Sequence, residues 1–176
     1  DESFWEFAFD REEETMLPYI GQFQSLFLLR SFTKMYGIPG LRLGYGLCSD
    51  TDLLERMEEV RQPWSVSIPA QEAGITALDE TDWCRQVRSY VTEQRMWLAG
   101  ELESMGCKVY PSSANYLLFY LDQELMESLK RKGILIRDCS NYQGLTKGYY
   151  RIAVKTEEEN RQLIDAIRDA LDKADL

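Results

Sequence analysis

The sequence predicts an α/β protein. Short apolar runs of strand length alternate with longer stretches whose apolar residues recur at helical spacing, and clusters of Gly and Pro separate them. With 176 residues, of which 44% are hydrophobic, the chain is long enough to bury a core. These features indicate an ordinary globular fold rather than a disordered chain.

The first part of the chain is expected to hold two strands and a helix. Residues 27–32 form an apolar run typical of a buried strand, and residues 41–48, with alternating glycines, indicate a second strand. A turn rich in Gly and Pro separates the two runs, so Lys34 is predicted to lie in a loop between them. Helical spacing of apolar residues follows over residues 52–61 and stops before Pro63.

Two helices are predicted for the middle of the chain. Ser67 can cap a helix that runs to about Ala77, and Thr81 can cap a longer one whose apolar face continues towards Gly106. Because the pattern changes after this long helix, we expect it to bridge two lobes.

The last part of the chain is predicted to be a small α/β lobe. Strands are expected near residues 108–110, 115–121, 134–138 and 149–154, with helices over 123–132 and at the C-terminal end. Thr156 and Glu159 have the spacing of a capping box, which places the start of the last helix. The apolar stripe of that helix indicates core packing.

The charge of the chain argues against two classes of partner. Lys and Arg number 20 against 30 Asp and Glu, which gives a formal net charge of −10. Such a chain repels phosphate backbones and anionic lipid surfaces. No apolar run approaches the length of a membrane span, so we expect neither a nucleic acid nor a membrane as partner.

Histidine is absent, and the four cysteines are widely spaced. The absence of histidine excludes Ser-His-Asp and Cys-His nucleophile systems and zinc sites built on His, and we expect no metal site. The cysteines form no Cys-x-x-Cys pair and are expected to be reduced, mostly buried thiols of a cytoplasmic protein. Proton chemistry must then use Lys, Tyr, Cys or carboxylates, which is easier if a cofactor accepts electrons.

One segment combines groups that can bind a phosphorylated aldehyde. Ser31 lies three residues before Lys34, and Arg42 lies eight residues after it. Arg42 offers a planar donor fork that suits a phosphate, and a lysine amine can form an imine with an aldehyde. On spacing alone, Lys34 and Arg42 could equally be surface charges on a loop.

This segment resembles the S-x-[ST]-K-x-x-x-x-P-G-x-R-x-G signature of fold-type I pyridoxal-phosphate (PLP) enzymes in the class I and II aminotransferase family, and all fixed positions are present. The resemblance implies PLP as cofactor, Lys34 as the catalytic lysine that holds it as a Schiff base, and Ser31 and Arg42 as ligands of its phosphate. Asp1 begins a sequence similar to the family's D-E-A-[YF] strand end, which implies that its carboxylate pairs with the pyridine nitrogen. Phe4 stands where aminotransferases commonly have Tyr, so no phenol can come from this position.

The small lobe resembles that of a narrower group in this family, which includes threonine-phosphate decarboxylase of cobalamin biosynthesis and its relative histidinol-phosphate aminotransferase. The motif closer to the decarboxylase is Arg137-x-Cys139-x-Asn141-Tyr142-x-Gly144-Leu145 followed by Tyr149-Tyr150-Arg151. By this resemblance, Arg137 and Arg151 bind the two anionic ends of an amino-acid phosphate. Each arginine could instead be a salt-bridge residue of an edge strand. Asn141 and Tyr142 could line the same pocket, but a turn before Gly144 is the favoured interpretation.

The resemblance implies decarboxylation of L-threonine O-3-phosphate to aminopropanol phosphate by a full-length homodimer. One alternative is an aminotransferase, such as one for histidinol phosphate, which would break the bond from Cα to hydrogen instead of the bond to the carboxylate. The other is a non-catalytic family member that senses a ligand. The choice between the two reactions depends on substrate orientation, which the sequence does not determine.

The resemblance also implies a division of the chain into three parts. Residues 1–62 are expected to be the C-terminal remnant of the PLP-binding large domain, residues 63–106 bridging helices, and residues 107–176 the small α/β C-terminal domain. The family's N-terminal half is not among these residues, so we expect this piece alone to bind PLP poorly and to be inactive. Residues 64–67 could serve a neighbouring subunit or act as a linker.

Overall fold

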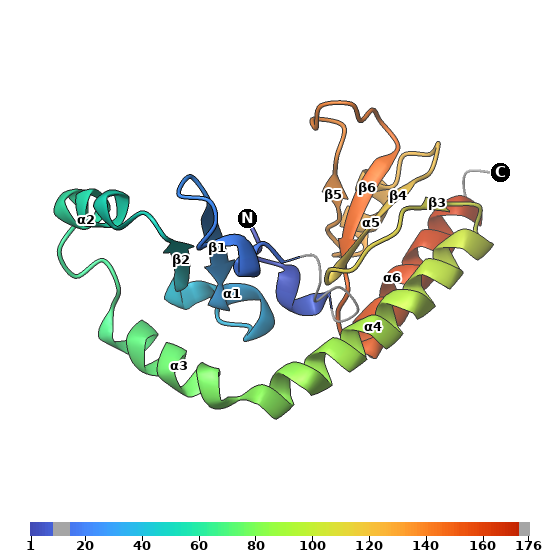
Figure 1. Ribbon diagram of the computed structural model, residues 1–176. Coiled ribbons are helices and arrows are strands. Elements are labelled where there is room, and N and C mark those ends of the chain that lie inside the picture. The colour runs from blue at the N-terminus through green and yellow to red at the C-terminus, as the bar shows by residue number, and fades with distance from the viewer. Residues whose placement is uncertain (9–14, 173–176) are drawn as a thin grey trace. The chain divides into compact units, whose positions relative to one another are not determined.

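The computed structural model describes residues 1–8 and 15–172 (Figure 1). The chain divides into two compact units, Asp1–Arg88 and Ser89–Leu176. The long helix α4 (Thr81–Ser104) begins in the first unit and ends in the second. This division into two units differs from the expected three parts, which stay a prediction.

The first unit contains an antiparallel pair of strands, β1 (Phe27–Ser31) and β2 (Gly44–Cys48). The two strands lie so close at Gly44 that a Cβ there would be only 2.8 Å from the carbonyl oxygen of Arg30. A residue with a side chain would not fit at this position without a shift of the backbone. Both predicted strands are confirmed, although the second begins at Gly44 rather than at residue 41. Burial differs from the prediction, since Leu28 is the one buried residue of β1.

The prediction that Lys34 lies in a loop is wrong. The short helix α1 (Phe32–Met35) follows β1 directly, and Lys34 is its third residue. Ser31 caps this helix, because its Oγ accepts a hydrogen bond from the backbone N–H of Thr33 at 3.2 Å. The 3-10 helix η4 (Pro39–Leu41) then delays the start of β2 to Gly44.

Three further helices have the predicted positions. Asp50 caps α2 (Thr51–Val60) by accepting from the N–H of Leu53, and Ser67 caps α3 (Ile68–Asp79) by accepting from that of Ala70. Thr81 is the first residue of α4 rather than its cap. In the described residues before β1, the chain forms the 3-10 helices η1 (Trp5–Phe7) and η3 (Leu17–Tyr19).

The second unit is built on a four-stranded antiparallel sheet with the order β3-β4-β6-β5. The strands are β3 (Lys108–Val109), β4 (Tyr116–Tyr120), β5 (Arg137–Asp138) and β6 (Tyr149–Ala153). The helices are the C-terminal part of α4, α5 (Met126–Arg131) and α6 (Glu157–Asp172). The predicted small α/β lobe is confirmed, although the strand expected over 134–138 has only its last two residues.

Alternate residues of the central strands β4 and β6 are buried, so one face of the sheet belongs to the core. Leu98 and Leu102 of α4 and Ile167 of α6 are fully buried with them. The capping box before α6 is also confirmed, because Glu159 N–H donates to Thr156 Oγ1 and Thr156 N–H to Glu159 Oε2, each at 3.3 Å.

All four cysteines are free, and three of them are buried, as the sequence predicted. Among the helices of residues 1–8 and 15–172, none is both long and apolar enough to pass through a bilayer.

Candidate functional site

The N-terminal residues run beside β1 of the first unit. The backbone N–H of Glu2 donates to the carbonyl oxygen of Leu29 at 2.8 Å, which places Asp1 next to the strand. One carboxylate oxygen of Asp1 accepts hydrogen bonds from Ser3, at 2.8 Å from its N–H and at 2.6 Å from its hydroxyl. The predicted cofactor ligand Asp1 is thus exposed and held by its own local turn.

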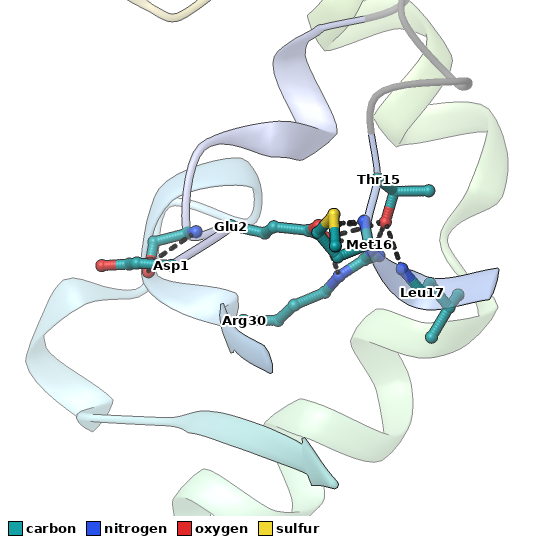
Figure 2. Close-up of polar contacts among 7 residues, drawn as sticks. Asp1, Glu2, Thr15, Met16, Leu17 and Arg30 are labelled. Atoms are coloured by element: carbon teal, nitrogen blue, oxygen red, sulfur yellow. Dashed lines mark hydrogen bonds and ion pairs between the residues drawn. The ribbon is translucent and has the colours of Figure 1, made fainter. Parts of the chain in front are cut away.

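Glu2 and Arg30 form the ionic anchor of this segment (Figure 2). Their side chains lie 2.8 Å apart and are only 11% exposed, and Glu2 also accepts from the Thr15 hydroxyl and the Met16 N–H. Burial alone would raise the pKa of Glu2, but the hydrogen bonds from Met16, Arg30 and Thr15 lower it below its ordinary value. This anchor fixes the position of Asp1 beside β1.

Sequence reasoning missed this anchor. Its partners lie 13 and 28 residues away from Glu2 along the chain, and no motif links them. Arg30 also stacks on Trp5, with its guanidinium carbon 4.5 Å from the ring centre. The alternation of β1 could have indicated that Arg30 points away from Leu29, but not which carboxylate it meets.

The predicted phosphate ligands Ser31 and Arg42 come from the same end of the two-stranded sheet. Ser31 is paired with Gly44 in the ladder, and the N–H of Phe32 donates to the carbonyl oxygen of Leu43 at 3.2 Å. Arg42 immediately precedes this contact. The Ser31 hydroxyl also lies 2.8 Å from the hydroxyl of Thr33, so two hydroxyl groups gather at the start of α1.

Lys34 is exposed on α1, three residues after the cap. Its ammonium nitrogen lies 5.5 Å from the centre of the Phe4 ring, a cation–π distance. The structure therefore brings the predicted lysine next to the segment that begins at Asp1. Lys34 is exposed, and within residues 1–8 and 15–172 no carboxylate forms an ion pair with it.

Arg42 has an unusual backbone conformation. Its φ of 54° lies in the left-handed region, which is unfavourable for a residue with a side chain as long as that of arginine. Its guanidinium donates one hydrogen bond to the carbonyl oxygen of Pro39 at 2.9 Å and is otherwise exposed. Such strain often occurs at ligand sites, where it places a side chain that a relaxed backbone would direct elsewhere.

These groups fit a phosphorylated aldehyde cofactor. The segments around Lys34 offer the amine of Lys34 and the guanidinium of Arg42. They also offer the neighbouring hydroxyls of Ser31 and Thr33 and the exposed carboxylate of Asp1. Hydroxyls and a guanidinium can bind a phosphate dianion, an amine can hold an aldehyde carbon, and a carboxylate can pair with a protonated ring nitrogen.

Tyr36, two residues after the lysine, has a packing role. Its ring stacks on that of Phe32 with the centres 5.4 Å apart. Burial raises the pKa of Tyr36, and a hydrogen bond with the Cys84 thiol raises it further. A phenol in this state is a poor proton donor at neutral pH.

The two predicted substrate arginines are direct neighbours in the second unit. Arg137 of β5 and Arg151 of β6 are register partners in the antiparallel ladder, so they share one face of the sheet. The Cζ of Arg151 lies 5.0 Å from the centre of the Tyr116 ring, and that of Arg137 lies 5.6 Å from the centre of the Tyr142 ring. Over the described ranges 1–8 and 15–172, neither arginine has a carboxylate within ion-pair distance.

Asn141 and Tyr142 do form a turn, as the sequence favoured. The N–H of Tyr142 donates to the carbonyl oxygen of Cys139 at 3.0 Å, and that of Leu145 donates to the carbonyl oxygen of Tyr142 at 3.1 Å. Both side chains also contact Arg137. The Oδ1 of Asn141 accepts a hydrogen bond from Arg137 Nη2 at 3.2 Å, and the ring of Tyr142 lies under the guanidinium at 5.6 Å. The turn and the arginine are thus parts of one arrangement.

A match to a protein-family model shows to which family the chain is related. The family model described as "Aminotransferase class I and II" matches residues 1–167. The chain belongs to the class I and II aminotransferase family. This membership supports the resemblance that the segment around Lys34 suggested.

Relatives within this aminotransferase family carry two different names. Threonine-phosphate decarboxylase of Salmonella typhimurium is 37% identical over 97% of this chain and 48% of its own length. Histidinol-phosphate aminotransferase of Nitratidesulfovibrio vulgaris is 36% identical over 99% of this chain and 47% of its own length. The chain thus spans about half the length of the curated relatives that it matches.

The fold is that of fold-type I PLP enzymes, over about half of their length. The crystal structure of histidinol-phosphate aminotransferase from Clostridium acetobutylicum matches with a TM-score of 0.92 and 27% identity, covering 98% of this chain and 54% of that one. Pyridoxal 5'-phosphate is the cofactor of this aminotransferase family. The roles of the individual site residues stay predictions.

Proposed function

We propose that the full-length protein is a PLP-dependent decarboxylase that converts L-threonine O-3-phosphate to aminopropanol phosphate in cobalamin biosynthesis. The observation that carries this proposal is the pair of arginines, Arg137 and Arg151, opposite each other on β5 and β6. Like charges directly opposite on a sheet destabilise it unless an anion lies between or above them. A substrate with both a carboxylate and a phosphate supplies two such anions.

The surroundings of the two arginines support binding of a ligand from outside the chain. Their neighbours are the rings of Tyr116 and Tyr142 and the neutral amide of Asn141. These contacts orient the guanidinium groups, and in the described residues no carboxylate lies within ion-pair distance of either; Asp138 attracts Arg137 only from beyond that distance. Most donors of both guanidinium groups are therefore available for carboxylate or phosphate oxygens.

The first unit supplies the residues that we assign to the cofactor. When bound, PLP provides an electron-withdrawing ring that accepts the electron pair of a bond broken at the substrate's Cα. Lys34 would hold the aldehyde carbon through its amine and later move a proton at Cα. Ser31 and Arg42 would bind the phosphate, and Asp1 would keep a proton on the ring nitrogen.

Amine transfer from histidinol phosphate is the second candidate, because a relative with that activity in its name is 36% identical to this chain, as close as the named decarboxylase. Both substrates carry a phosphate, so both are compatible with the arginine pair. They differ in the carboxylate, which threonine phosphate has and histidinol phosphate lacks. Two arginines facing each other therefore favour threonine phosphate.

A product assay on the full-length protein loaded with PLP tests the proposal. The protein is incubated with threonine phosphate, and carbon dioxide is measured. In a parallel reaction it is incubated with histidinol phosphate and 2-oxoglutarate, and glutamate is measured. Carbon dioxide without glutamate is the expected result. Glutamate alone would establish the aminotransferase, and a protein that shows neither product nor a PLP absorbance band would be the non-catalytic family member.

We also propose that the full-length protein is a cytoplasmic homodimer. The support is the family membership together with four free cysteines, which are typical of a reducing compartment. Sedimentation of the PLP-loaded protein should give twice the mass of one chain. A monomer with full activity would contradict this assignment.

A further inference from the structure

The loop after β5 holds the side chain of Arg137 through two neutral partners. Asn141 accepts a hydrogen bond from its guanidinium at 3.2 Å, and the ring of Tyr142 lies 5.6 Å from its central carbon. A carboxylate in either place would neutralise the arginine. An amide and a phenol ring instead restrict its orientation and keep its positive charge for a ligand.

The loop itself is fixed to the sheet. Both carboxylate oxygens of Asp138 bind Ser140, accepting from its N–H at 2.8 Å and from its hydroxyl at 3.0 Å. Cys139 is buried, and its N–H donates to the carbonyl oxygen of Tyr149 at 2.9 Å. Asn141 and Tyr142 therefore stand on a backbone that β5 and β6 position.

We propose that Asn141 and Tyr142 are positioning residues that hold Arg137 ready to bind the phosphate of the substrate. This inference rests on the proposed function, since it assigns one of the two substrate anions to Arg137. An exposed arginine samples many rotamers, and holding it in advance reduces the entropy lost when the ligand binds. Neither residue needs to touch the reacting bonds.

The location of Arg137 favours the phosphate over the carboxylate. β5 is the edge strand of the sheet, and the Arg137 side chain is exposed, whereas Arg151 on the inner strand β6 is half-buried. A phosphate dianion loses more hydration energy on burial than a carboxylate with a single charge. The exposed arginine therefore suits the dianion, and the half-buried arginine suits the carboxylate.

The decisive variant is Asn141→Asp in the full-length protein loaded with PLP, so that the cofactor's own phosphate site is filled. Aspartate forms the same kind of turn as asparagine, but its carboxylate would pair with Arg137 and repel a phosphate. Inorganic phosphate is the probe, and its dissociation constant is measured by calorimetry. We expect at least about tenfold weaker binding, because a charge-assisted hydrogen bond is replaced by repulsion. A role in the turn alone predicts no change.

Matched variants separate the local effect from general ones. Gln143→Asp places the same charge on an exposed residue of the same loop, and we expect phosphate binding within about twofold of the wild type. Tyr142→Phe keeps the ring and should bind phosphate normally. Tyr142→Leu removes the ring and should weaken binding by about two- to fivefold, the usual size of an exposed cation–π contact.

Turnover of threonine phosphate gives a second readout. Asn141→Asp should raise KM by a factor similar to its loss of phosphate affinity and leave kcat within about twofold, because a positioning residue for a remote anion acts on binding. The proposal is overturned if Asn141→Asp binds phosphate like the wild type, if Gln143→Asp loses as much, or if Arg137→Ala binds phosphate normally. A wild type that fails to turn over threonine phosphate, but shows the expected series of phosphate affinities, would refute only the proposed function.

Discussion

The residue that departs most from relaxed geometry near Lys34 is Arg42, whose φ is 54°. A glycine or asparagine would accept this conformation at little cost, whereas an arginine pays about 1 kcal/mol for it. The chain nevertheless has an arginine here, and its guanidinium donates a hydrogen bond to the carbonyl oxygen of Pro39 in η4. Backbone strain of this kind clusters at ligand sites, which supports the assignment of Arg42 to the cofactor's phosphate.

We therefore predict that Arg42→Asn separates stability from cofactor binding. Asparagine tolerates a positive φ, so the melting temperature should stay the same or rise slightly. The affinity for PLP should fall at least about tenfold, because the charged donor fork for the phosphate is lost. Absorbance titration of the full-length apoprotein with PLP measures this affinity. Unchanged affinity would remove Arg42 from the cofactor site.

The lowered pKa of Glu2 makes the stability of the first unit depend on pH. Its pKa in the folded protein lies below the ordinary value of 4.5, because three hydrogen-bonding partners outweigh the effect of burial. A carboxylate with a lowered pKa stabilises the fold at pH values above the unfolded pKa, and this contribution disappears as the pH falls through the folded pKa. The anchor formed with Arg30 should thus weaken in acid.

The variant Glu2→Gln tests this relation. At neutral pH it should destabilise the first unit by about 1.5–3 kcal/mol, the range for hydrogen bonds to charged groups. Below the ordinary carboxylate pKa the difference from the wild type should shrink, since the wild type then loses the same charge. Denaturant melts at both pH values measure the effect. A constant difference at both would contradict the role of the Glu2 charge.

Among the elements, α4 and α6 of the second unit are joined by a buried polar contact. Asn160 is 1% exposed; its amide nitrogen donates to Gln94 Oε1 at 2.9 Å and to the carbonyl oxygen of Lys155 at 3.0 Å. Its side-chain oxygen accepts from the N–H of Lys155 at 3.0 Å. This asparagine therefore connects the start of α6 to the middle of α4.

We predict that Asn160→Ala destabilises the second unit by about 2–4 kcal/mol, because buried donors and acceptors lose their partners and a small cavity remains. Gln162→Ala is the matched control on the exposed side of the same helix, and its effect should stay within about 0.5 kcal/mol. Chemical denaturation followed by circular dichroism measures both variants. Equal effects of the two substitutions would show that the buried contact contributes little.

Sequence patterns located most elements but not all of their details. Helical periodicity with a cap residue located α2 and α3, and the Thr156–Glu159 spacing located the start of α6. The helix around Lys34 was missed because four residues are too short to show a periodicity. The strand over 134–138 was overestimated, since an apolar run does not reveal which residues find a pairing partner.

For the candidate site, a local motif was sufficient to select residues but not to describe their contacts. Ser31, Lys34 and Arg42 belong to one continuous segment, and their spacing carries the information. The Glu2–Arg30 anchor and the pairing of Arg137 with Arg151 depend on chain segments that meet only in the folded state. Such contacts leave no local signal in a single sequence.

In the whole molecule, the deeply buried side chains are concentrated in one unit. Among the residues that the structure describes, the largest side chains below 2% exposure all lie in the second unit: Phe119, Leu98, Leu102, Leu117, Leu125, Leu129, Ile164, Ile167, Asn160 and Cys139. We predict that in this 176-residue chain the amides of β4 and α6 exchange with deuterium at least about tenfold more slowly than those of β1 and β2. Uniform exchange rates across both units would contradict a deeper core in the second unit than in the first.

We assign the amine of Lys34 as the group that binds the cofactor. Borohydride reduction of the full-length protein with PLP, followed by peptide mapping, tests it most directly because reduction makes the link permanent. We expect the cofactor's mass on the peptide that contains Lys34, and no such mass in Lys34→Ala. Labelling of another lysine in the wild type, or of none, would contradict it.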